Sequence, residues 1–482
     1  MPPRPDRPFE HRTAFRCRLS PGTRLERRGE RHLLLRERPP AVVELGEAGA
    51  RLLEAVREGR TLTPSREEVG LLHRLAFLGL VELRPVPESW PKVTVVVPVR
   101  DRPRQLATCL ASLRRLRYPS DRLEVVVVDD GSREPPWSGP ARMVRLPAPR
   151  GPAAARNAGA GQARGEVLAF LDSDCRAEED WLRELVTELA GPGVAAAGGR
   201  VLAAREGSWL ERYEAVRSPL DLGAHPARVL PGGPVPYLVA ACLAVRRADF
   251  VAVGGFDERL RHGEDVDLCW RLVARGRGVV YQPLAVVRHE HRGRLGDFAL
   301  TRARYAASEA ALLRRHPEGR RWLGLSPGAA AALAGTLAAL FGRGRPAALG
   351  GLALAVETAV GVRRLGGLGI PPRPALGALA AGQATGLYHL SRQLCRYYGL
   401  PALGLALTAG RSRRRLLLGL GAAALLPGLA DWWRLRPSLS PPVFAAASLL
   451  DDLAYQAGLW LGCLRERTLA PFLVELRLAR RR

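Results

Sequence analysis

The chain has 482 residues, 47% of them hydrophobic, which is enough for two or three domains with buried cores and excludes an intrinsically disordered protein. Its formal charge of +26 comes almost wholly from arginine, which favours a phosphorylated substrate, an anionic membrane or nucleic acid as partner, although a GC-rich genome gives the same bias. The seven scattered cysteines form no Cys-x-x-Cys pair, which excludes a disulfide framework and a zinc cluster and indicates a reducing compartment.

Residues 1–88 are expected to be an arm followed by a small module. The first 40 residues contain no apolar run of signal-peptide length, so we predict no signal peptide and a cytosolic start. Ser65 then begins a capping box, a helix is predicted to end at Gly79, and residues 80–84 predict a strand. This order is typical of winged-helix modules. It resembles the peptide-recognition domains of pathways for ribosomally made, modified peptides, and a plain structural extension is an equally good interpretation.

Beyond a linker at residues 88–91, predicted strands and helices alternate. Continuous apolar runs are typical of strands that are buried on both faces of a parallel sheet. The predicted strands are residues 93–99, 123–128, 142–146 and 166–171, and the predicted helices are residues 102–116 and 151–163. This order predicts an α/β fold with a doubly wound sheet, in which ligands bind beyond the carboxyl ends of the strands.

Polar side chains follow three of these predicted strands. They are Arg100 and Asp101 after the first strand, Asp129 and Asp130 after the second, and Asp172 and Asp174 after the fourth. Residues two apart in an extended chain point to the same side, so Asp172 and Asp174 can face one cleft and hold a divalent cation, Mg²⁺ or Mn²⁺. Each group alone is also typical of an acidic turn, but three strand ends on one rim indicate a shared site.

An ordered set of short motifs runs through the same part of the chain. They are residues 96–106, 127–132, 156–159, 170–174, 254–258, 263–268, 271–272 and 279–283. In this order they resemble the inverting family 2 glycosyltransferases, which have the type A nucleotide-diphospho-sugar transferase fold, and a catalytic domain is expected over residues 92–300. The family more often has Asn where this chain has Asp101, and either residue can accept a hydrogen bond.

The resemblance implies how a UDP-sugar donor would be bound. Asp129 would accept hydrogen bonds from the uracil edge, and Asp130 from uracil or ribose, because each carboxylate offers several acceptor positions. Arg156 and Asn157 would contact the nucleotide or its phosphates. The complete set implied for the nucleotide-sugar site is Arg100, Asp101, Asp129, Asp130, Arg156, Asn157 and Asp172.

The resemblance also implies a metal site. Asp174, with Asp172 directly or through water, would hold a Mn²⁺ or Mg²⁺ that bridges the diphosphate of the donor. His289 lies just past the next motif and is a candidate third ligand, as in some family members. A structural or solvated histidine is the alternative interpretation of His289.

Residues 264–275 predict a helix that begins with acidic residues. The helix dipole alone favours acids at this position, and Asp267 with Arg271 is an ordinary ion pair one turn apart. The resemblance implies that Asp265, the second member of the Glu264–Asp265 pair, is the general base, with Glu264 in a supporting or acceptor-binding role. The implied reaction is one in-line displacement with inversion at the anomeric carbon.

Residues 301–482 are predicted to form apolar helices. The apolar runs are residues 328–341, 346–362, 376–390, 400–409, 416–430 and 443–464. Polar residues interrupt them, among them Glu357, Gln383 and Asp451, so none is a clean membrane span. The best candidate is 416–430, which follows four arginines and precedes Trp432. We expect this region to lie on, or partly enter, the cytoplasmic face of an anionic inner membrane, with a soluble helical bundle as the alternative.

The complete layout resembles the mycofactocin-system glycosyltransferases. That resemblance implies transfer of a hexose, glucose from UDP-glucose, onto premycofactocin, a redox cofactor derived from a peptide. A family 2 transferase for cell-wall or capsular polysaccharide or for a glycolipid is the alternative enzyme. A basic winged-helix protein that binds nucleic acid ranks last, because the arginines are spread through every segment, and no nucleic acid is expected as a partner.

Overall fold

The computed structural model describes residues 14–28, 31–37, 40–57, 61–136, 139–291, 293–320, 322–367 and 370–478. By their contacts the residues divide into two units. Unit 1 comprises residues 1–35 and 43–292, and unit 2 comprises residues 36–42 and 293–482. Each unit has its own buried hydrophobic core.

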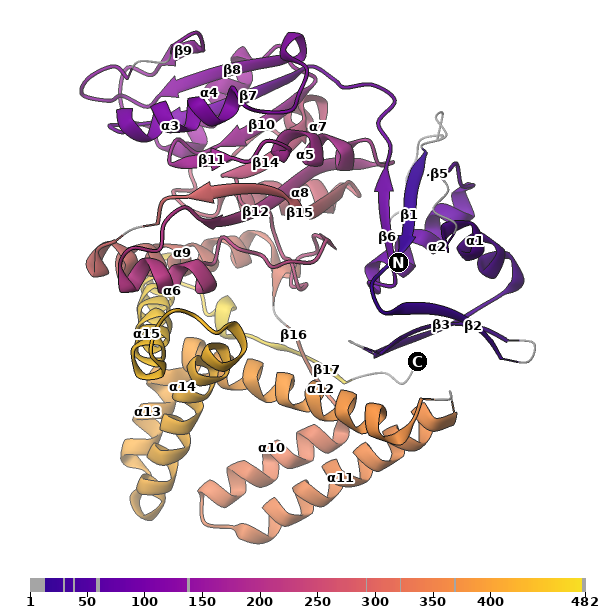
Figure 1. The fold of residues 1–482 in the computed structure, drawn as a ribbon. Coiled ribbons are helices and arrows are strands. Elements are labelled where there is room, and N and C mark those ends of the chain that lie inside the picture. The colour runs from indigo at the N-terminus through magenta and orange to yellow at the C-terminus, as the bar shows by residue number, and fades with distance from the viewer. Residues whose placement is uncertain are drawn as a thin grey trace. The chain divides into compact units, whose positions relative to one another are not determined.

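The N-terminal module contains two small sheets and two helices (Figure 1). One sheet has the strand order β5-β1-β6 and the other β2-β3-β4. The predicted capping box is confirmed at the start of α2, where the backbone N–H of Ser65 donates to the Glu68 carboxylate at 2.7 Å and the Ser65 hydroxyl accepts from the Glu68 N–H. The elements are β1 (Phe15–Leu19), β2 (Thr23–Arg28), β3 (Arg31–Glu37), β4 (Pro40–Leu45), α1 (Glu47–Arg57), β5 (Thr61–Leu62), α2 (Arg66–Phe77) and β6 (Val81–Pro85).

A nine-stranded mixed sheet forms the centre of unit 1 (Figure 1). Its order is β11-β15-β12-β14-β10-β7-β8-β9, with β13 paired to β15. The four strands predicted from apolar runs, β10, β7, β8 and β9, are adjacent and parallel, so their carboxyl ends share one edge as expected. The strands are β7 (Val93–Val99), β8 (Leu123–Asp129), β9 (Arg142–Arg145), β10 (Val167–Leu171), β11 (Cys175–Ala177), β12 (Val194–Ala203), β13 (Ala227–Arg228), β14 (Cys242–Arg246) and β15 (Gly278–His289).

Helices cover this sheet because their apolar sides pack against its valine-rich strands. In α5, for example, Trp181, Leu182 and Leu185 are completely buried. Helix α4 lies directly on β7 at Gly159, where a Cβ atom would come within 2.4 Å of Val96. The helices are α3 (Pro103–Leu113), α4 (Pro152–Gln162), α5 (Trp181–Leu189), α6 (Trp209–Arg217), α7 (Arg247–Ala252) and α8 (Glu264–Ala274), with a 3-10 turn at Ser120–Arg122.

Strand β15 is longer than the sequence suggests. Residues 279–281 and 285–288 look like two segments, but they belong to one twelve-residue strand that pairs in parallel with β12 and antiparallel with β11. A register shift in the β12 pairing lets the strand bend after Gln282. The far end of β15 therefore places His289 opposite Cys175, directly after Asp174.

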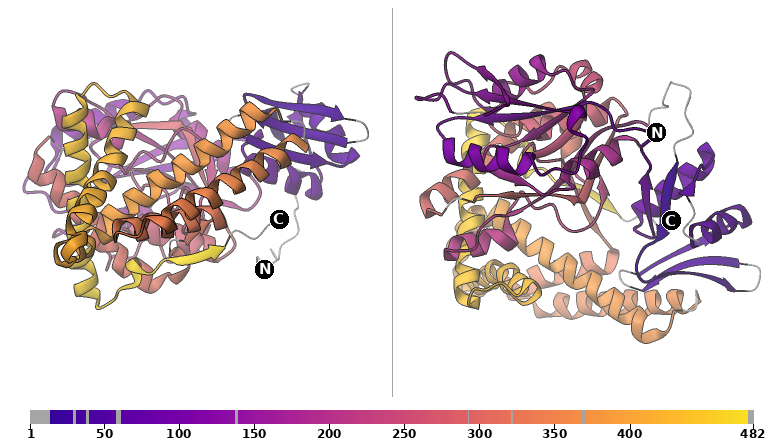
Figure 2. Two further views of the ribbon diagram at one scale, coloured as in Figure 1. Left: turned by 90° about the horizontal axis from the view of Figure 1, so that it is seen from below. Right: turned by 45° about the horizontal axis from the view of Figure 1, so that its top comes forward.

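Unit 2 is mainly helical, and each apolar run predicted from the sequence lies in a helix. Helices α10 and α11 form an antiparallel hairpin, seen side by side in both views of Figure 2. The elements are α9 (Leu295–Arg315), β16 (Trp322–Leu325), α10 (Pro327–Leu340), α11 (Gly344–Gly367), α12 (Pro372–Gln393), a π-turn (Leu394–Tyr398), α13 (Gly399–Thr408), α14 (Arg413–Leu435), α15 (Pro441–Glu466) and β17 (Glu475–Leu478), with 3-10 turns at Pro317–Gly319, Gly410–Ser412 and Ala470–Phe472.

Small residues form the seam between α9 and α15. A Cβ atom on Gly458 would lie 2.0 Å from the carbonyl oxygen of Ala303, and one on Gly462 would lie 2.3 Å from that of Ala307. These pairs are four residues apart on both helices, so each helix presents one stripe of small residues to the other. Such close backbone approach is the packing mode that small-xxx-small patterns favour.

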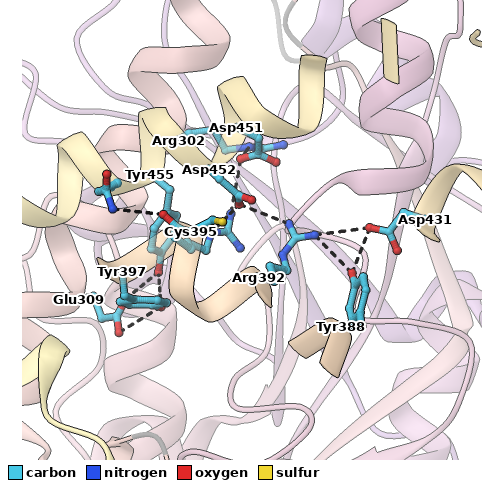
Figure 3. A network of polar contacts seen from close by, with 12 residues as sticks. Arg302, Glu309, Tyr388, Arg392, Cys395, Tyr397, Asp431, Asp451, Asp452 and Tyr455 are labelled. Atoms are coloured by element: carbon cyan, nitrogen blue, oxygen red, sulfur yellow. Dashed lines mark hydrogen bonds and ion pairs between the residues drawn. The ribbon is translucent and has the colours of Figure 1, made fainter. Parts of the chain in front are cut away.

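Polar side chains tie the same helices together (Figure 3). Asp451 on α15 forms a buried ion pair with Arg302 on α9, with 3.0 Å between the Arg302 Nε and a carboxylate oxygen. Asp452 pairs with Arg396 in the π-turn. The Tyr455 hydroxyl donates to Glu309 at 2.6 Å. The charged residues that interrupt the last apolar run therefore point into the unit and meet partners there.

Candidate functional site

Asp129 lies at the carboxyl end of β8 and is completely buried. Its Oδ1 accepts the backbone N–H of Ser132 at 2.9 Å. Among the described residues its Oδ2 accepts no hydrogen bond, and Nε of Arg145 lies 3.5 Å from it. A buried carboxylate oxygen without a donor is costly, so this atom is suited to accept an N–H from a ligand such as a nucleobase.

The loops beside Asp129 are held by their own acidic side chains. The two oxygens of Asp130 accept the backbone N–H groups of Arg150 and Gly151, at 2.7 and 2.9 Å, and so shape the turn before α4. Asp101 has a φ of 54°, a left-handed conformation that Asp and Asn adopt more easily than most residues. Its N–H donates to the Ser132 hydroxyl at 2.9 Å. Arg100 is half exposed at the same rim, near the Asp101 carboxylate.

Arg156 is buried on α4 between two carboxylates. Its guanidinium donates to Oδ1 of Asp172 at 2.6 Å and to Oε1 of Glu264 at 2.7 Å. The ring of Phe256 lies 5.6 Å from its central carbon. The structure therefore brings Arg156, Asp172 and Glu264 together, although they were predicted to serve different parts of the reaction.

Asn157 is also engaged with the protein. Its side-chain amide donates to the carbonyl of Phe256 at 2.9 Å and to Glu258 at 3.0 Å, and its oxygen accepts the Phe256 N–H at 2.9 Å. These bonds fasten the loop of residues 254–258 to α4. All the hydrogen-bonding groups of the Asn157 side chain face this loop, and its contact with a nucleotide stays a prediction.

Asp172 and Asp174 follow β10 and take different partners. Burial by itself raises the pKa of Asp172, but Arg156 outweighs burial and, with His289 and Arg102, holds that pKa below its usual value. Asp174 forms an ion pair with Arg102, and its Oδ1 lies 3.5 Å from Nε2 of His289. The ring of His289 is mostly buried, and its Nδ1 makes no hydrogen bond to the part of the chain that the structure describes.

The predicted metal ligands are thus close together but only partly arranged as a metal site. Asp174 and His289 face one another, which suits an ion held by an oxygen and a nitrogen. Asp172 is turned toward Arg156 instead. Within the described ranges, no three His, Cys, Asp or Glu side chains are grouped closely enough to hold a metal. A bound ion would need further ligands, such as diphosphate oxygens.

Asp265 lies in the first turn of α8, beside Glu264. One carboxylate oxygen accepts the N–H of Ala240 at 3.1 Å and the other accepts the N–H of Val266 at 2.9 Å. Burial, and then the negative charge of Glu264, raise the pKa of Asp265 to about 7. A carboxylate with a pKa near neutrality is suited to general-base chemistry.

Sequence reasoning missed three parts of this arrangement. Arg102, which pairs with Asp174, lies inside the first motif but was given no role. The Ala240 N–H that holds Asp265 is a backbone group, so residue type gives no signal for it. Phe256 lies in a motif, but its place beside Arg156 depends on a contact across 100 residues of chain.

The comparisons with known proteins point to one family. Residues 94–253 match the family model described as glycosyl transferase family 2. The chain is 35% identical over 471 residues to the pre-mycofactocin glycosyltransferase of Mycobacterium tuberculosis, strains CDC 1551 / Oshkosh and ATCC 25618 / H37Rv, which covers 93% of this chain and 95% of that protein. The chain belongs to the mycofactocin-system glycosyltransferases of family 2. It therefore has the type A glycosyltransferase fold and is a glycosyltransferase.

Other similarities of this glycosyltransferase are partial. It is 35% identical over 260 residues to the O-antigen biosynthesis protein RfbC of Myxococcus xanthus, which covers 48% of this chain and 19% of that protein. A solved structure, the mannosyltransferase PcManGT from Pyrobaculum calidifontis in complex with GDP-Man and Mn²⁺, is 21% identical, with a TM-score of 0.39, and covers 73% of this chain and 89% of that one.

Proposed function

We propose that this glycosyltransferase moves glucose from UDP-glucose onto a hydroxyl of premycofactocin, with inversion and with the help of Mn²⁺ or Mg²⁺. The observation that carries the proposal is the similarity over nearly the whole chain to the pre-mycofactocin glycosyltransferase, which includes the N-terminal module and unit 2. The buried Oδ2 of Asp129, which accepts no hydrogen bond from the described residues, supports a uracil nucleotide as the donor, because N3–H of uracil can donate to it.

In the proposed reaction Asp265 takes the proton of the acceptor hydroxyl. The acceptor oxygen then forms a bond to the anomeric carbon as the bond between that carbon and the β-phosphate oxygen breaks. The bonding electron pair leaves with UDP, and attack from the opposite face inverts the configuration. The backbone N–H groups of Ala240 and Val266 orient the Asp265 carboxylate for this task.

The residues that would hold the metal are Asp174 and His289, with Asp172 directly or through water. The 3.5 Å between Oδ1 of Asp174 and Nε2 of His289 supports this assignment. A divalent ion there would supply charge stabilisation for the departing diphosphate. In the free enzyme the positive charge of Arg102 offsets the negative charge of the Asp174 carboxylate.

A transfer assay tests this proposal. Purified full-length protein would be incubated with Mn²⁺, premycofactocin and, in separate reactions, UDP-glucose, UDP-galactose, UDP-N-acetylglucosamine and GDP-mannose. We expect mass spectrometry to find added hexose with UDP-glucose, and NMR to find a β-configured product from the α-linked donor. Transfer only to lipid or polysaccharide acceptors would show that premycofactocin is not the acceptor and would favour a family 2 transferase for polysaccharide or glycolipid. Retention of configuration would exclude an inverting mechanism.

We further propose that unit 2 holds the enzyme on the cytoplasmic face of an anionic inner membrane. Its helices have large apolar side chains on the outside, the reverse of a soluble bundle. The exposed side chains include Leu337, Leu349, Leu352, Val356, Val360, Leu376, Leu387, Leu400, Leu403, Leu405, Leu407, Leu418, Leu425, Leu426, Leu429 and Trp433.

The interiors of these helix pairs are small or polar. A Cβ on Gly335 would lie 2.4 Å from the carbonyl of Pro346, and one on Gly350 would lie 2.4 Å from that of Ala331, so α10 and α11 meet through backbone. Glu357 accepts the Gly328 N–H at the start of α10, at 2.6 Å. Polar groups turned inward and small residues at helix seams are typical of helices in lipid, which supports the membrane proposal.

The mode of membrane association follows from helix length and charge. Among the described residues one helix, Gly410–Leu435, is long and apolar enough to cross a membrane, and one such helix is weak evidence for a span. Arginines stand at the helix ends: Arg343 lies between α10 and α11, Arg345 in the first turn of α11, and Arg363 and Arg364 near the end of α11. This pattern favours helices that lie in the interface with anionic head groups at their ends.

A further inference from the structure

We propose that Arg156 is a positioning residue that couples the donor side of the site to the acceptor base, by holding Asp172 and Glu264 in one buried ion-pair bridge. This inference rests on the proposed transfer reaction. It differs from the role that family resemblance implies for Arg156, a direct contact with the nucleotide.

The first argument is that Arg156 cannot leave its place easily. Its side chain is 5% exposed, and two of its nitrogens already donate to carboxylates at 2.6 and 2.7 Å. Turning toward a nucleotide would leave Glu264, itself nearly buried, without its cation. Breaking a buried pair by removing one partner is strongly unfavourable.

Arg102 provides a contrast within the same site. It pairs with Asp174 as Arg156 pairs with Asp172, but its side chain is 41% exposed, and Asp174 is the partner the structure gives it. Arg102 is therefore free to exchange Asp174 for a phosphate when the donor arrives. Arg156 is fixed by its second partner and by the ring of Phe256, so its charge stays between the two carboxylates.

The second argument concerns what the bridge connects. Asp172 follows β10 on the donor side, and Glu264 begins α8, next to Asp265. Glu264 raises the proton affinity of Asp265 and Arg156 lowers it. The groups that face the Asp265 carboxylate are Glu264 from its own helix, Arg156 from α4 and the backbone N–H groups of Ala240 and Val266.

A functional consequence follows from these charges. Positive charge that arrives beside Asp172 with the donor offsets the negative charge of that carboxylate. The net charge of the bridge, and so its potential at Asp265, then becomes more positive although Arg156 does not move. The base is then ionised more readily when the donor is in place. The bridge thus makes Asp265 a more effective base when the donor is bound than when the donor site is empty.

Arg271 gives a matched control for a purely structural role. It donates to Asp267 on its own helix at 2.7 Å and joins α8 to a neighbouring loop through the carbonyl groups of Val253 and Gly255, at 2.6 and 2.7 Å. Its hydrogen bonds within the described residues go to Asp267, Val253 and Gly255, and none goes to Asp172 or Glu264. A variant of Arg271 therefore loosens the same helix without touching the bridge.

The test compares Arg156→Lys, Arg156→Gln, Arg156→Gln with Glu264→Gln, and Arg271→Gln. Each full-length protein would be examined for melting temperature, UDP affinity with Mn²⁺ by calorimetry, and kcat from pH 5 to 9. For Arg156→Gln we expect kcat to fall at least tenfold, UDP affinity to change less than threefold, and the acid limb of kcat to move to higher pH by about one unit. Arg156→Lys should recover part of kcat, and the added Glu264→Gln should return the acid limb toward its original pH.

Three outcomes would overturn the inference. One is that the acid limb of the kcat profile of Arg156→Gln lies at the same pH as in the wild type and in Arg271→Gln. Another is a loss of UDP affinity equal to the loss of kcat, which would make Arg156 a direct donor contact. A third is no return of the limb in the double variant. If the wild type itself transfers no sugar while it still binds UDP and Mn²⁺, the proposed acceptor is wrong instead.

Discussion

Nε2 of His289 lies 3.5 Å from Oδ1 of Asp174, although 115 positions separate them in the chain. The antiparallel pairing of β11 with β15 creates this proximity. We predict that Asp174→Ala abolishes manganese-dependent UDP binding and that Asp172→Ala has a smaller effect. We also predict that His289→Gln weakens Mn²⁺ binding in the presence of UDP by about tenfold or more. Electron paramagnetic resonance of free Mn²⁺ measures all three. Unchanged Mn²⁺ binding in His289→Gln would leave His289 a structural residue.

Arg102 competes with a cation for Asp174 in the free enzyme. We therefore predict that Arg102→Ala binds Mn²⁺ without nucleotide more tightly than the wild type, because a neighbouring positive charge is removed. Arg104→Ala is the control, since Arg104 lies two residues later, in the first turn of α3, and is exposed. Equal Mn²⁺ affinity in Arg102→Ala and the wild type would contradict this competition.

The pH dependence of the reaction should follow the ionisation of Asp265. The pKa of Asp265 is raised to about 7, so the base is protonated below that pH and the rate falls there. We predict that kcat rises between pH 6 and 8, and that Asp265→Asn lowers kcat by about 10²- to 10⁴-fold while UDP affinity stays within a few-fold. Stopped assays of UDP release across pH give the profile. Normal transfer by Asp265→Asn would require another base.

The same carboxylate should reduce stability at high pH. The folded pKa of about 7 exceeds the ordinary value of 3.8, so folding favours the protonated form, and the stability that Asp265 contributes below about pH 4 is lost as pH rises through 7. Asn cannot ionise. We predict that Asp265→Asn raises the melting temperature by a few degrees at pH 8 and leaves it nearly unchanged at pH 4, as measured by differential scanning fluorimetry.

Membrane association can be tested on the outer face of α11. Leu349 and Leu352 are 67% and 61% exposed, so Leu349→Asp with Leu352→Asp should preserve the fold but lower co-sedimentation with phosphatidylglycerol vesicles several-fold. Val251→Asp is the matched control, because Val251 is 68% exposed in unit 1. Wild-type protein that stays in solution with such vesicles would favour the soluble bundle.

The sequence predicts the part of the site that depends on strand ends. Asp129, Asp130, Asp172 and Asp174 could be grouped because parallel strands end at one edge of a sheet. The capping box at Ser65 was also readable, since its two hydrogen bonds join residues three apart.

Contacts between segments that are distant in the chain could not be predicted from the sequence in the same way. Arg156 reaches Glu264 across 108 residues, and residue type alone does not distinguish a nucleotide contact from a buried bridge. The partners of Asp451 and Asp452 likewise come from other helices, so these residues looked like interruptions of an apolar run. In both cases the deciding interaction is a tertiary one, which local patterns do not encode.

The seams of unit 2 have a consequence for the substitutions that this chain can accept. At Gly458 and Gly462 even a single methyl group would collide with the backbone of α9. The outward leucines of α11, by contrast, touch little of the protein. A saturation scan should therefore find the smallest side chains of unit 2 to be the least replaceable, while its largest apolar ones exchange freely among themselves.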